Sequence, residues 1–449
     1  METKDVHKIA AMIAKNGYIV YNKAFGHHTY AKQIPNKTDN IYDIASITKI
    51  AATLPAIMKL YDAGMIRLDT FLSNYYPPLK ETDKKEITVK EILTHTAGLK
   101  PIVPTFTYAI DKKALPGQLF TVKPTAQNNL KLKNRLYANP NYRFRDSTLS
   151  RKALPDYELL TPGLYICKTY RDTTLCCILN SELNPKKDYV YSDLGFILLQ
   201  KAIENLTGKP LDHYCWENFY QKLGAYNTVF QAAKRFNASR IIPSSVDKLY
   251  RKTEIKGYVH DPAATLLGGV AGHAGLFSTA EDLAKIMAVY LNQGRYGGEY
   301  FFSPVTVRLF TQKTDTPPTN RRGLGFDKPE TDTTKSSPAC KNAPACSFGH
   351  TGFTGGINLA DEYINGYEKH GHWKDTAILL KGEAVFSLTT MFLSMWDYLI
   401  KKEGEDYAAY YPDSWDENAQ GIVQPFADNP LDDEAVGETV YLNLINKAK

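Results

Sequence analysis

A serine and a lysine three residues apart stand at the beginning of a strongly apolar helical segment. Apolar residues recur at helical spacing from Ser46 to Tyr61, and Gly64 follows as a stop signal. Pro55 should bend this helix. Residues three apart share a helix face, so the Lys49 amine should lie beside the Ser46 hydroxyl. The pattern therefore predicts a buried helix whose first turn carries a nucleophile and its proton partner.

This pair is chemically suited to nucleophilic catalysis. A serine hydroxyl is weak until a base removes its proton, and a lysine can be that base only if burial or positive charge lowers its pKa. The helix N-terminus also offers backbone N–H groups to a developing oxyanion. Because Ser245-Val246-Asp247-Lys248 has the same S-x-x-K form, the tetrapeptide alone is weak evidence. Ser46 is favoured because it precedes an apolar helix, whereas Ser245 lies in a polar stretch.

Strand signals towards both chain ends surround a helical middle. Residues 11–14 and 18–21 flank Asn16-Gly17, a pair suited to a tight hairpin turn. Residues 278–281 have the form of a capping box before an apolar helix face. These signals predict an α+β fold, with an antiparallel sheet built from the two chain ends beside a helical portion. Residues 106–156 have no steady period and indicate an insertion or loop-rich cap.

Composition excludes several classes of function. The 449 residues are 43% apolar, enough for one large mixed domain or two ordinary ones, and the net charge of +6 is too mild to indicate nucleic-acid binding. The histidines show no i, i+4 ligand spacing, so we expect no metal and no cofactor. No segment reaches the roughly 20 apolar residues of a transmembrane helix. Residues 1–10 show no signal peptide, which predicts a cytoplasmic protein if this start is native.

Two further motifs carry groups that can move a proton or bind a substrate. Tyr191-Ser192-Asp193 precedes an apolar helix, and a tyrosine can pass a proton when nearby lysine charge favours its phenolate form. His350-Thr351-Gly352 predicts a strand edge whose glycine permits close approach of an extended substrate. His95 in Thr94–Leu99 is interpreted as a structural hydrogen-bonding residue. Residues 268–275 are interpreted as a close-packing glycine turn.

Together these motifs resemble the three-motif signature of the β-lactamase-like serine hydrolases, which include class C β-lactamases, D-Ala-D-Ala carboxypeptidases and esterases. Residues 269–284 and Gly323-Leu324-Gly325-Phe326-Asp327 are also similar to the family. The resemblance implies a β-lactamase/transpeptidase-like fold, an antiparallel sheet flanked by helices with a helical subdomain. It implies a hydrolase domain over 1–356, with the insertion at 106–156, and a divergent region over 357–449 that could complete the sheet.

The resemblance also implies roles for individual residues. Ser46 would attack a carbonyl to form an acyl-enzyme, and Lys49 and Tyr191 would exchange its proton, with the identity of the base left open. The N–H groups of Ser46 and Phe353 would form the oxyanion hole. The substrate-binding residues would be Asp193, His350, Thr351, Gly352 and Phe353. The substrate would be a peptidoglycan-type D-amino-acyl peptide or another small ester or amide.

The chain departs from the family pattern in ways that affect the predicted function. His350 stands where most β-lactamases have lysine, and Asp193 replaces the common asparagine, which favours a carboxypeptidase or esterase over a true β-lactamase. The altered tail motivates an alternative, a catalytically silent ligand-sensing or structural member. The resemblance implies a periplasmic or envelope location. It also suggests a hypothesis, that the chain is the rear half of a fusion with a family 3 glycoside hydrolase.

Overall fold

The structure is a computed structural model, and the part of the chain that it describes comprises residues 8–15, 17–29, 31–133, 135–314, 320–329, 346–352 and 377–378. The chain divides into two compact units. The first holds residues 1–327 and 350–377, and the second holds 328–349 and 378–449. Nearly all described elements, and every residue of the site below, belong to the first unit.

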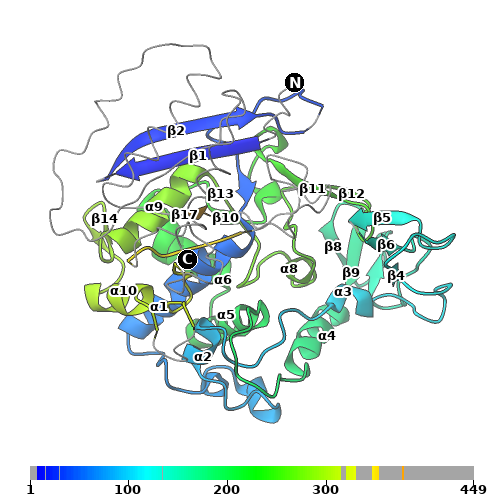
Figure 1. The fold of residues 1–449 in the computed structure, drawn as a ribbon, viewed down its shortest axis with the longest axis horizontal. Helices are drawn as coiled ribbons and strands as arrows, with labels where there is room; N and C mark the ends of the chain where they lie inside the picture. Colours follow the sequence, from blue (N-terminus) through cyan, green and yellow to red (C-terminus); the bar gives the residue numbers. More distant parts are fainter. Residues whose placement is uncertain are drawn as a thin grey trace, which may run out of the picture. The chain divides into compact units, whose positions relative to one another are not determined.

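An antiparallel hairpin begins the described chain, as the sequence predicts. Strands β1 (Lys8–Lys15) and β2 (Tyr18–Gly26) pair along their length, with a bulge between Ile13 and Ala14. Gly17 takes the positive φ of 83° that the turn requires. The hairpin lies across α9 (Ala280–Leu291), which contacts β1 (Figure 1). Most of the region expected to supply strands from the other chain end lies outside the described residues, and within it the structure describes one strand, β17 (Ala377–Ile378).

A small buried sheet sets the position of the predicted nucleophile. Its strand order is β10 (Val229–Phe230), β13 (Leu276–Ser278) and β3 (Tyr42–Asp43). Phe277 faces Asp43 in the antiparallel register, and Ile41 and Phe277 are fully buried in one apolar cluster. The chain therefore enters the Ser46 segment from an anchored strand end.

The helix that follows has three parts instead of one bent α-helix. A 3-10 turn at Ala45–Ile47 is followed by a π-helical turn at Lys49–Thr53 and by α1 (Leu54–Asp62). Pro55 lies in the first turn of α1, where a missing N–H leaves no hydrogen bond unmade. The buried carbonyls of Ile50 and Ala51 instead accept hydrogen bonds from tyrosine hydroxyls, those of Tyr290 at 2.7 Å and Tyr220 at 2.9 Å. Next to Pro55 the chain thus changes from a π-helical turn to an α-helix, where the sequence predicted a bend.

The helical portion of the unit packs around α5 (Leu194–Thr207). This helix follows the Tyr191 motif as predicted and ends at Gly208, whose φ is 66°. It contacts α1, α2 (Val89–Leu93) and α6 (Leu211–Cys215). The other α-helices are α3 (Thr105–Tyr108), α4 (Lys168–Leu179), α7 (Gln221–Leu223), α8 (Pro262–Leu266) and α10 (Pro304–Thr311). None of the helices in the described part of the chain is both long and apolar enough to cross a lipid bilayer.

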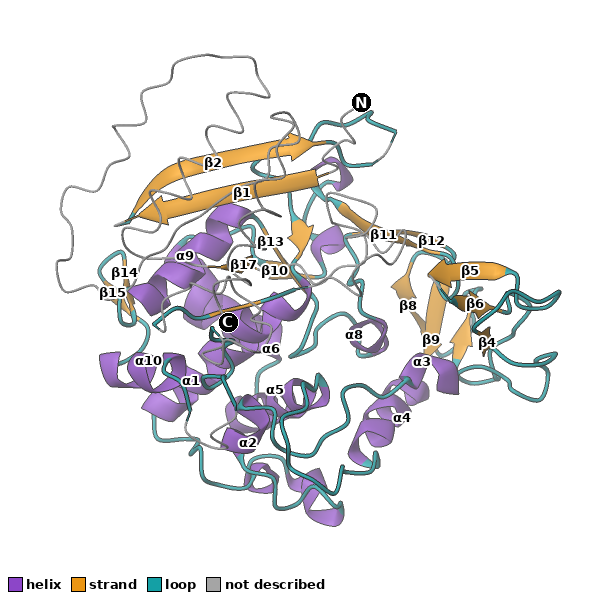
Figure 2. Cartoon of the chain, viewed as in Figure 1, coloured by secondary structure: helices purple, strands orange, loops and turns teal. Residues whose placement is uncertain are grey.

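The predicted insertion at 106–156 and the residues directly after it form short strands beside α3 and α4 (Figure 2). One sheet has the order β4 (Phe120–Thr121), β6 (Leu136–Ala138), β5 (Leu130–Lys133), and the other has the order β7 (Leu149–Ser150), β9 (Leu164–Cys167), β8 (Tyr157–Thr161). Strands of two to five residues are too short to show a period in the sequence. The remaining strands are β11 (Pro243–Asp247), β12 (Thr253–Lys256), β14 (Arg295–Tyr296), β15 (Glu299–Tyr300), β16 (Gly349–His350) and β17 (Ala377–Ile378).

The cap of α9 differs from the prediction by one residue. The N-cap is Thr279, whose side chain accepts the Asp282 N–H, so the predicted box between Ser278 and Glu281 is wrong. Ser278 is the last residue of β13, and its hydroxyl bonds with the Thr228 hydroxyl at 2.9 Å. Ser278 therefore belongs to a paired strand, although the local sequence pattern assigned it to the start of the helix.

Candidate active site

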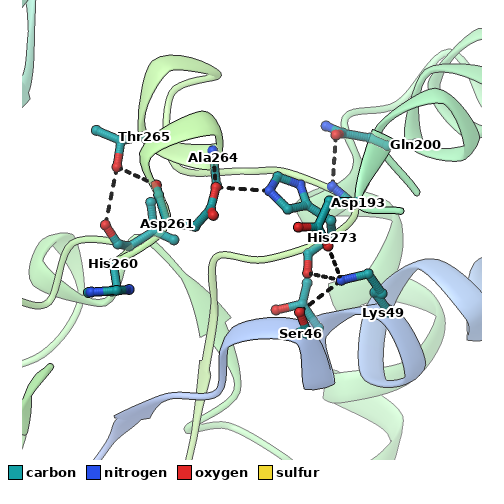
Figure 3. Close-up of polar contacts among 12 residues, drawn as sticks. Ser46, Lys49, Asp193, Gln200, His260, Asp261, Ala264, Thr265 and His273 are labelled. Atoms are coloured by element: carbon teal, nitrogen blue, oxygen red, sulfur yellow. Dashed lines mark hydrogen bonds and ion pairs between the residues drawn. The ribbon is translucent and has the colours of Figure 1, made fainter. Parts of the chain in front are cut away.

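The Lys49 side chain joins three separate segments of the chain. Its Nζ donates to Ser46 Oγ at 2.8 Å, to Asp193 Oδ1 at 2.7 Å and to the His273 carbonyl at 3.1 Å (Figure 3). Lys49 is fully buried, and these three acceptors surround its amine. The 3-10 turn at Ala45–Ile47 brings the serine and lysine together. The i, i+3 proximity predicted from the sequence is therefore present.

The charge state of Lys49 differs from the one that a lysine base needs. Burial lowers the pKa of the amine, but the Asp193 carboxylate and the Tyr191 phenol raise it further, and the net shift is upward. Lys49 is thus an ammonium group that donates a hydrogen bond to Ser46. In this state it cannot take the serine proton.

Tyr191 lies beside this network. Its ring centroid is 5.1 Å from Lys49 Nζ, and a side-chain hydrogen bond links it to Lys49. The His95 ring is 4.5 Å from the Tyr191 ring, and its Nδ1 accepts the Ser192 N–H at 3.1 Å. Burial lowers the pKa of His95 well below its usual range, so it is a neutral imidazole. This geometry agrees with the structural role expected for His95, which holds the loop that carries Tyr191.

The third motif approaches the nucleophile segment from another side. The His350 ring lies 6.0 Å from the Tyr191 ring, and its Nδ1 donates to the Thr351 carbonyl at 2.6 Å. Burial lowers the pKa of His350 to about 3, so this histidine carries no charge at neutral pH. A Cβ on Gly352 would lie 2.4 Å from the Ile44 carbonyl oxygen, so only glycine fits there. Phe353 lies outside the described residues.

Asp43 holds the backbone immediately before the nucleophile, a role that the sequence reasoning missed. Ala45 has a φ of 45°, which is uncommon for a residue with a Cβ. Its N–H donates to Asp43 Oδ1 at 2.9 Å, and the His260 N–H donates to Asp43 Oδ2 at 2.7 Å. Burial raises the pKa of Asp43 to about 6. Asp43 therefore fixes the backbone one residue before the nucleophile.

The glycine-rich loop at 268–275 packs closely against the same helix, in agreement with the turn expected there. Its Gly272 carbonyl accepts the Thr53 hydroxyl at 2.6 Å. A Cβ on Gly272 would lie 2.1 Å from the Phe196 carbonyl oxygen of α5. The ring of His273 bonds to Asp261 at 2.9 Å, and the carboxylate pKa is held well below its usual range by His273 despite burial (Figure 3).

A buried arginine completes the surroundings of Tyr191. The Arg322 guanidinium carbon lies 5.7 Å from the Tyr191 ring centroid, and its NH1 donates to Asp327 at 2.6 Å. The neighbouring Gly323–Asp327 segment was recognisable in the sequence, whereas Arg322 was not. An arginine directly before such a segment was the available signal. No group of His, Cys, Asp or Glu side chains within the described ranges is arranged to hold a metal ion.

A comparison with protein families decides the family of the chain. The model of the beta-lactamase family matches residues 1–144 and 169–365, more than half of the sequence. The chain belongs to the beta-lactamase family. This places it among serine hydrolases with an α+β, β-lactamase/transpeptidase-like fold, as the motif order predicted.

Relatives within the beta-lactamase family are of moderate similarity. A protein of Escherichia coli O157:H7, provisionally named a D-alanyl-D-alanine carboxypeptidase, is 28% identical over 375 residues, which are 78% of this chain and 74% of the relative. A protein of Salmonella gallinarum with the same provisional name is 28% identical over 383 residues, 79% of this chain and 75% of the relative.

Two solved structures are similar to this beta-lactamase family member. The structure of SurE has a TM-score of 0.50 at 16% identity, over 79% of this chain and 64% of that one, and supports the fold alone. A penicillin-binding protein homologue from Pyrococcus abyssi is 21% identical with a TM-score of 0.49, over 78% of this chain and 65% of that one.

Proposed function

We propose that this beta-lactamase family member is a serine carboxypeptidase or esterase that acts on D-amino-acyl peptides or small esters through an acyl-enzyme on Ser46. The observation that carries the proposal is the contact between the buried Lys49 ammonium and the Ser46 hydroxyl at 2.8 Å. The provisional carboxypeptidase names of the relatives support a peptidoglycan-type peptide as the substrate class. They also support a place in the cell envelope.

In the proposed mechanism Tyr191 is the base. Lys49 is an ammonium group and fixes the Ser46 oxygen, so another group has to take the serine proton. Tyr191, bonded to Lys49, is suited to this in its phenolate form. Ser46 Oγ attacks the substrate carbonyl carbon, and the proton moves to Tyr191 and then to the leaving amine or alcohol. Water hydrolyses the acyl ester, and Ser46 recovers its proton.

Backbone and side-chain groups would hold the substrate in this mechanism. The Ser46 N–H is proposed as one oxyanion donor, and the Phe353 N–H is proposed as the other. Asp193, His350, Thr351 and Gly352 are proposed to line the substrate site. His350, which is neutral, would offer a hydrogen bond instead of the positive charge of a lysine. This difference supports a carboxypeptidase or esterase over a true β-lactamase.

We also propose the domain organisation inferred from the sequence. Residues 1–356 would form the hydrolase domain with an insertion at about 106–156, and residues 357–449 would be the divergent region. The family model leaves residues 145–168 unmatched, a gap that overlaps the proposed insertion.

A labelling experiment tests the proposed function. The wild type should be labelled covalently by a fluorescent penicillin or a fluorophosphonate and should release D-alanine from a D-Ala-D-Ala peptide or hydrolyse p-nitrophenyl acetate. Ser46→Ala should abolish labelling. Ser245→Ala is the matched control, because Ser245 belongs to the second S-x-x-K sequence but lies on strand β11, and it should be labelled normally.

The alternative, a catalytically silent ligand-sensing protein, is not favoured. A silent protein has no need of a buried lysine fixed on a serine hydroxyl, since burying a charge costs folding free energy. Folded wild-type protein that neither reagent labels would support the silent alternative and contradict the proposed function.

A further inference from the structure

We propose that Arg322 is a positioning residue that acts through Tyr191, its guanidinium supplying the charge that keeps the phenol in the form that takes the Ser46 proton. This inference rests on the proposed function, in which Tyr191 is the base. It assigns a role to a residue outside the three motifs.

Arg322 is buried and fixed in place. It is fully inaccessible to solvent, and its NH2 donates to the Gly325 carbonyl at 3.3 Å. Its NH1 bonds to Asp327 at 2.6 Å and to the Tyr189 hydroxyl at 3.4 Å. The Nε of Arg322 has no partner among the described residues. A guanidinium held this firmly presents its charge to Tyr191 at a set distance.

The carboxylate beside Arg322 is shared between two arginines. Asp327 Oδ1 also accepts a bond from Arg321 NH2 at 3.2 Å. The Arg321 guanidinium lies over the Tyr189 ring at 5.7 Å, whereas that of Arg322 lies at the same distance from the ring of Tyr191. One carboxylate cannot neutralise two guanidinium groups, so the cluster has an excess positive charge.

The other titratable groups that are seen to face Tyr191 add no net negative charge. The charge of Lys49 is paired with Asp193 at 2.7 Å. His95 and His350, which also face the Tyr191 ring, are neutral because burial lowers the pKa of each. An excess buried charge is unfavourable unless an opposite charge balances it. The Tyr191 phenolate would provide that balance.

Arg322 can supply a positive charge that the third motif lacks in this sequence. With a neutral histidine at position 350, that motif contributes no fixed positive charge beside the phenol. Arg322 contributes one from a different part of the chain. A fixed positive charge close to a titratable group favours the anionic form of that group.

The test measures the rate constant for acylation of Ser46 by the fluorescent penicillin between pH 5 and pH 10 in folded variants. Arg322→Met should move the acid limb of the profile upwards by about one pH unit, a roughly tenfold loss at low pH that disappears at high pH. Arg322→Lys should keep the wild-type limb. Arg321→Met is the matched control, because Arg321 also pairs with Asp327. The acid limb of this variant should move by less than half as much as that of Arg322→Met.

A second variant covers the case in which Arg322→Met does not fold. Asp327→Asn leaves both arginines and removes their counter-charge, so its acid limb should move to lower pH. A parallel loss of rate at every pH, with the limb unmoved in Arg322→Met or in Asp327→Asn, would overturn the inference and assign Arg322 a purely structural role.

A spectroscopic readout separates this inference from the proposed function. Tyrosinate absorbance, taken as the difference between the wild type and Tyr191→Phe, should appear at higher pH when both proteins also carry Arg322→Met. If this shift occurs in protein that is not acylated, the inference holds and the proposed function fails. If acylation occurs at Ser46 but neither the tyrosinate signal nor the acid limb shifts, only the inference fails.

Discussion

The buried Lys49 ammonium lies 2.7 Å from a carboxylate oxygen of Asp193. The two residues are 144 positions apart in the chain, and each places an opposite charge beside the other. Asp193, with a smaller contribution from Tyr191, raises the pKa of Lys49 and so keeps it protonated in spite of its burial. The site therefore contains an ammonium group where a neutral lysine base was one of two options.

Replacing Asp193 with Asn should change the pH range in which Lys49 is charged. Without the carboxylate, burial is opposed only by the smaller contribution of the Tyr191 phenol, so the pKa of Lys49 should fall and the upper limb of the acylation profile should move to lower pH. Asp193→Glu retains the charge and should retain the limb. The measurement is the rate constant for covalent labelling of Ser46 against pH. An upper limb that stays in place in Asp193→Asn would show that Lys49 is charged for another reason.

Removing the Asp43 side chain should slow acylation without changing any group in contact with the substrate. Asp43→Ala deprives the Ala45 and His260 N–H groups of their acceptor, so the backbone before Ser46 should relax from its positive φ. A displacement of about 1 Å at a nucleophile costs roughly 100-fold in rate. The rate of labelling should fall accordingly. Equal labelling rates in the variant and the wild type would mean that the turn keeps its conformation without the Asp43 side chain.

Asp43 also predicts a pH dependence of stability. Its folded pKa of about 6 is above the ordinary value of 3.8, so the folded protein binds the proton more tightly than the unfolded chain does. The free energy of unfolding should therefore fall by about 3 kcal/mol from this group as pH rises from 4 to above 6. Asp43→Asn should remove this part of the slope in urea unfolding experiments. An identical slope in both proteins would contradict the prediction.

Gly352→Ala should disturb the nucleophile segment from the third motif. The new Cβ would lie 2.4 Å from the Ile44 carbonyl oxygen, which is backbone and cannot rotate away. We expect a loss of about 1–3 kcal/mol in stability, and an acylation rate at least about tenfold lower. The control is Gly297→Ala, whose Cβ would meet nothing within 4 Å. It should cost about 1 kcal/mol of backbone strain and leave the rate of acylation unchanged.

His95→Ala should lower stability by removing an acceptor from a buried donor. The Ser192 N–H would lose its bond to Nδ1, a change that costs about 1–3 kcal/mol. His95→Asn places an amide oxygen near the same position and should restore part of the loss. Thermal unfolding measures both variants. If His95→Asn is no more stable than His95→Ala, the ring contact with Tyr191 matters more than the hydrogen bond.

The sequence predicted the parts of the site that depend on local geometry. The spacing of Ser46 and Lys49 is enough to place them together, because one helical turn relates them. The pairing of Lys49 with Asp193 and the approach of Arg322 depend on tertiary packing, so no local pattern contains them. The same limit explains the fold: the hairpin at Gly17 was predictable, whereas the π-helical turn depends on hydroxyls that arrive from distant helices.

The loop at 268–275 is bound to the nucleophile helix through its own main chain. The Gly272 and His273 carbonyls accept from Thr53 and Lys49, the latter across 224 positions of sequence. Main-chain carbonyl oxygens remain hydrogen-bond acceptors when a side chain is substituted. They change position, however, when the loop changes length. A chimera that took the nucleophile helix from one homologue and this loop from another would inherit every reactive group. It would still lose their alignment if the two loops differed in length, so recombination within this family should succeed only when the loop lengths match.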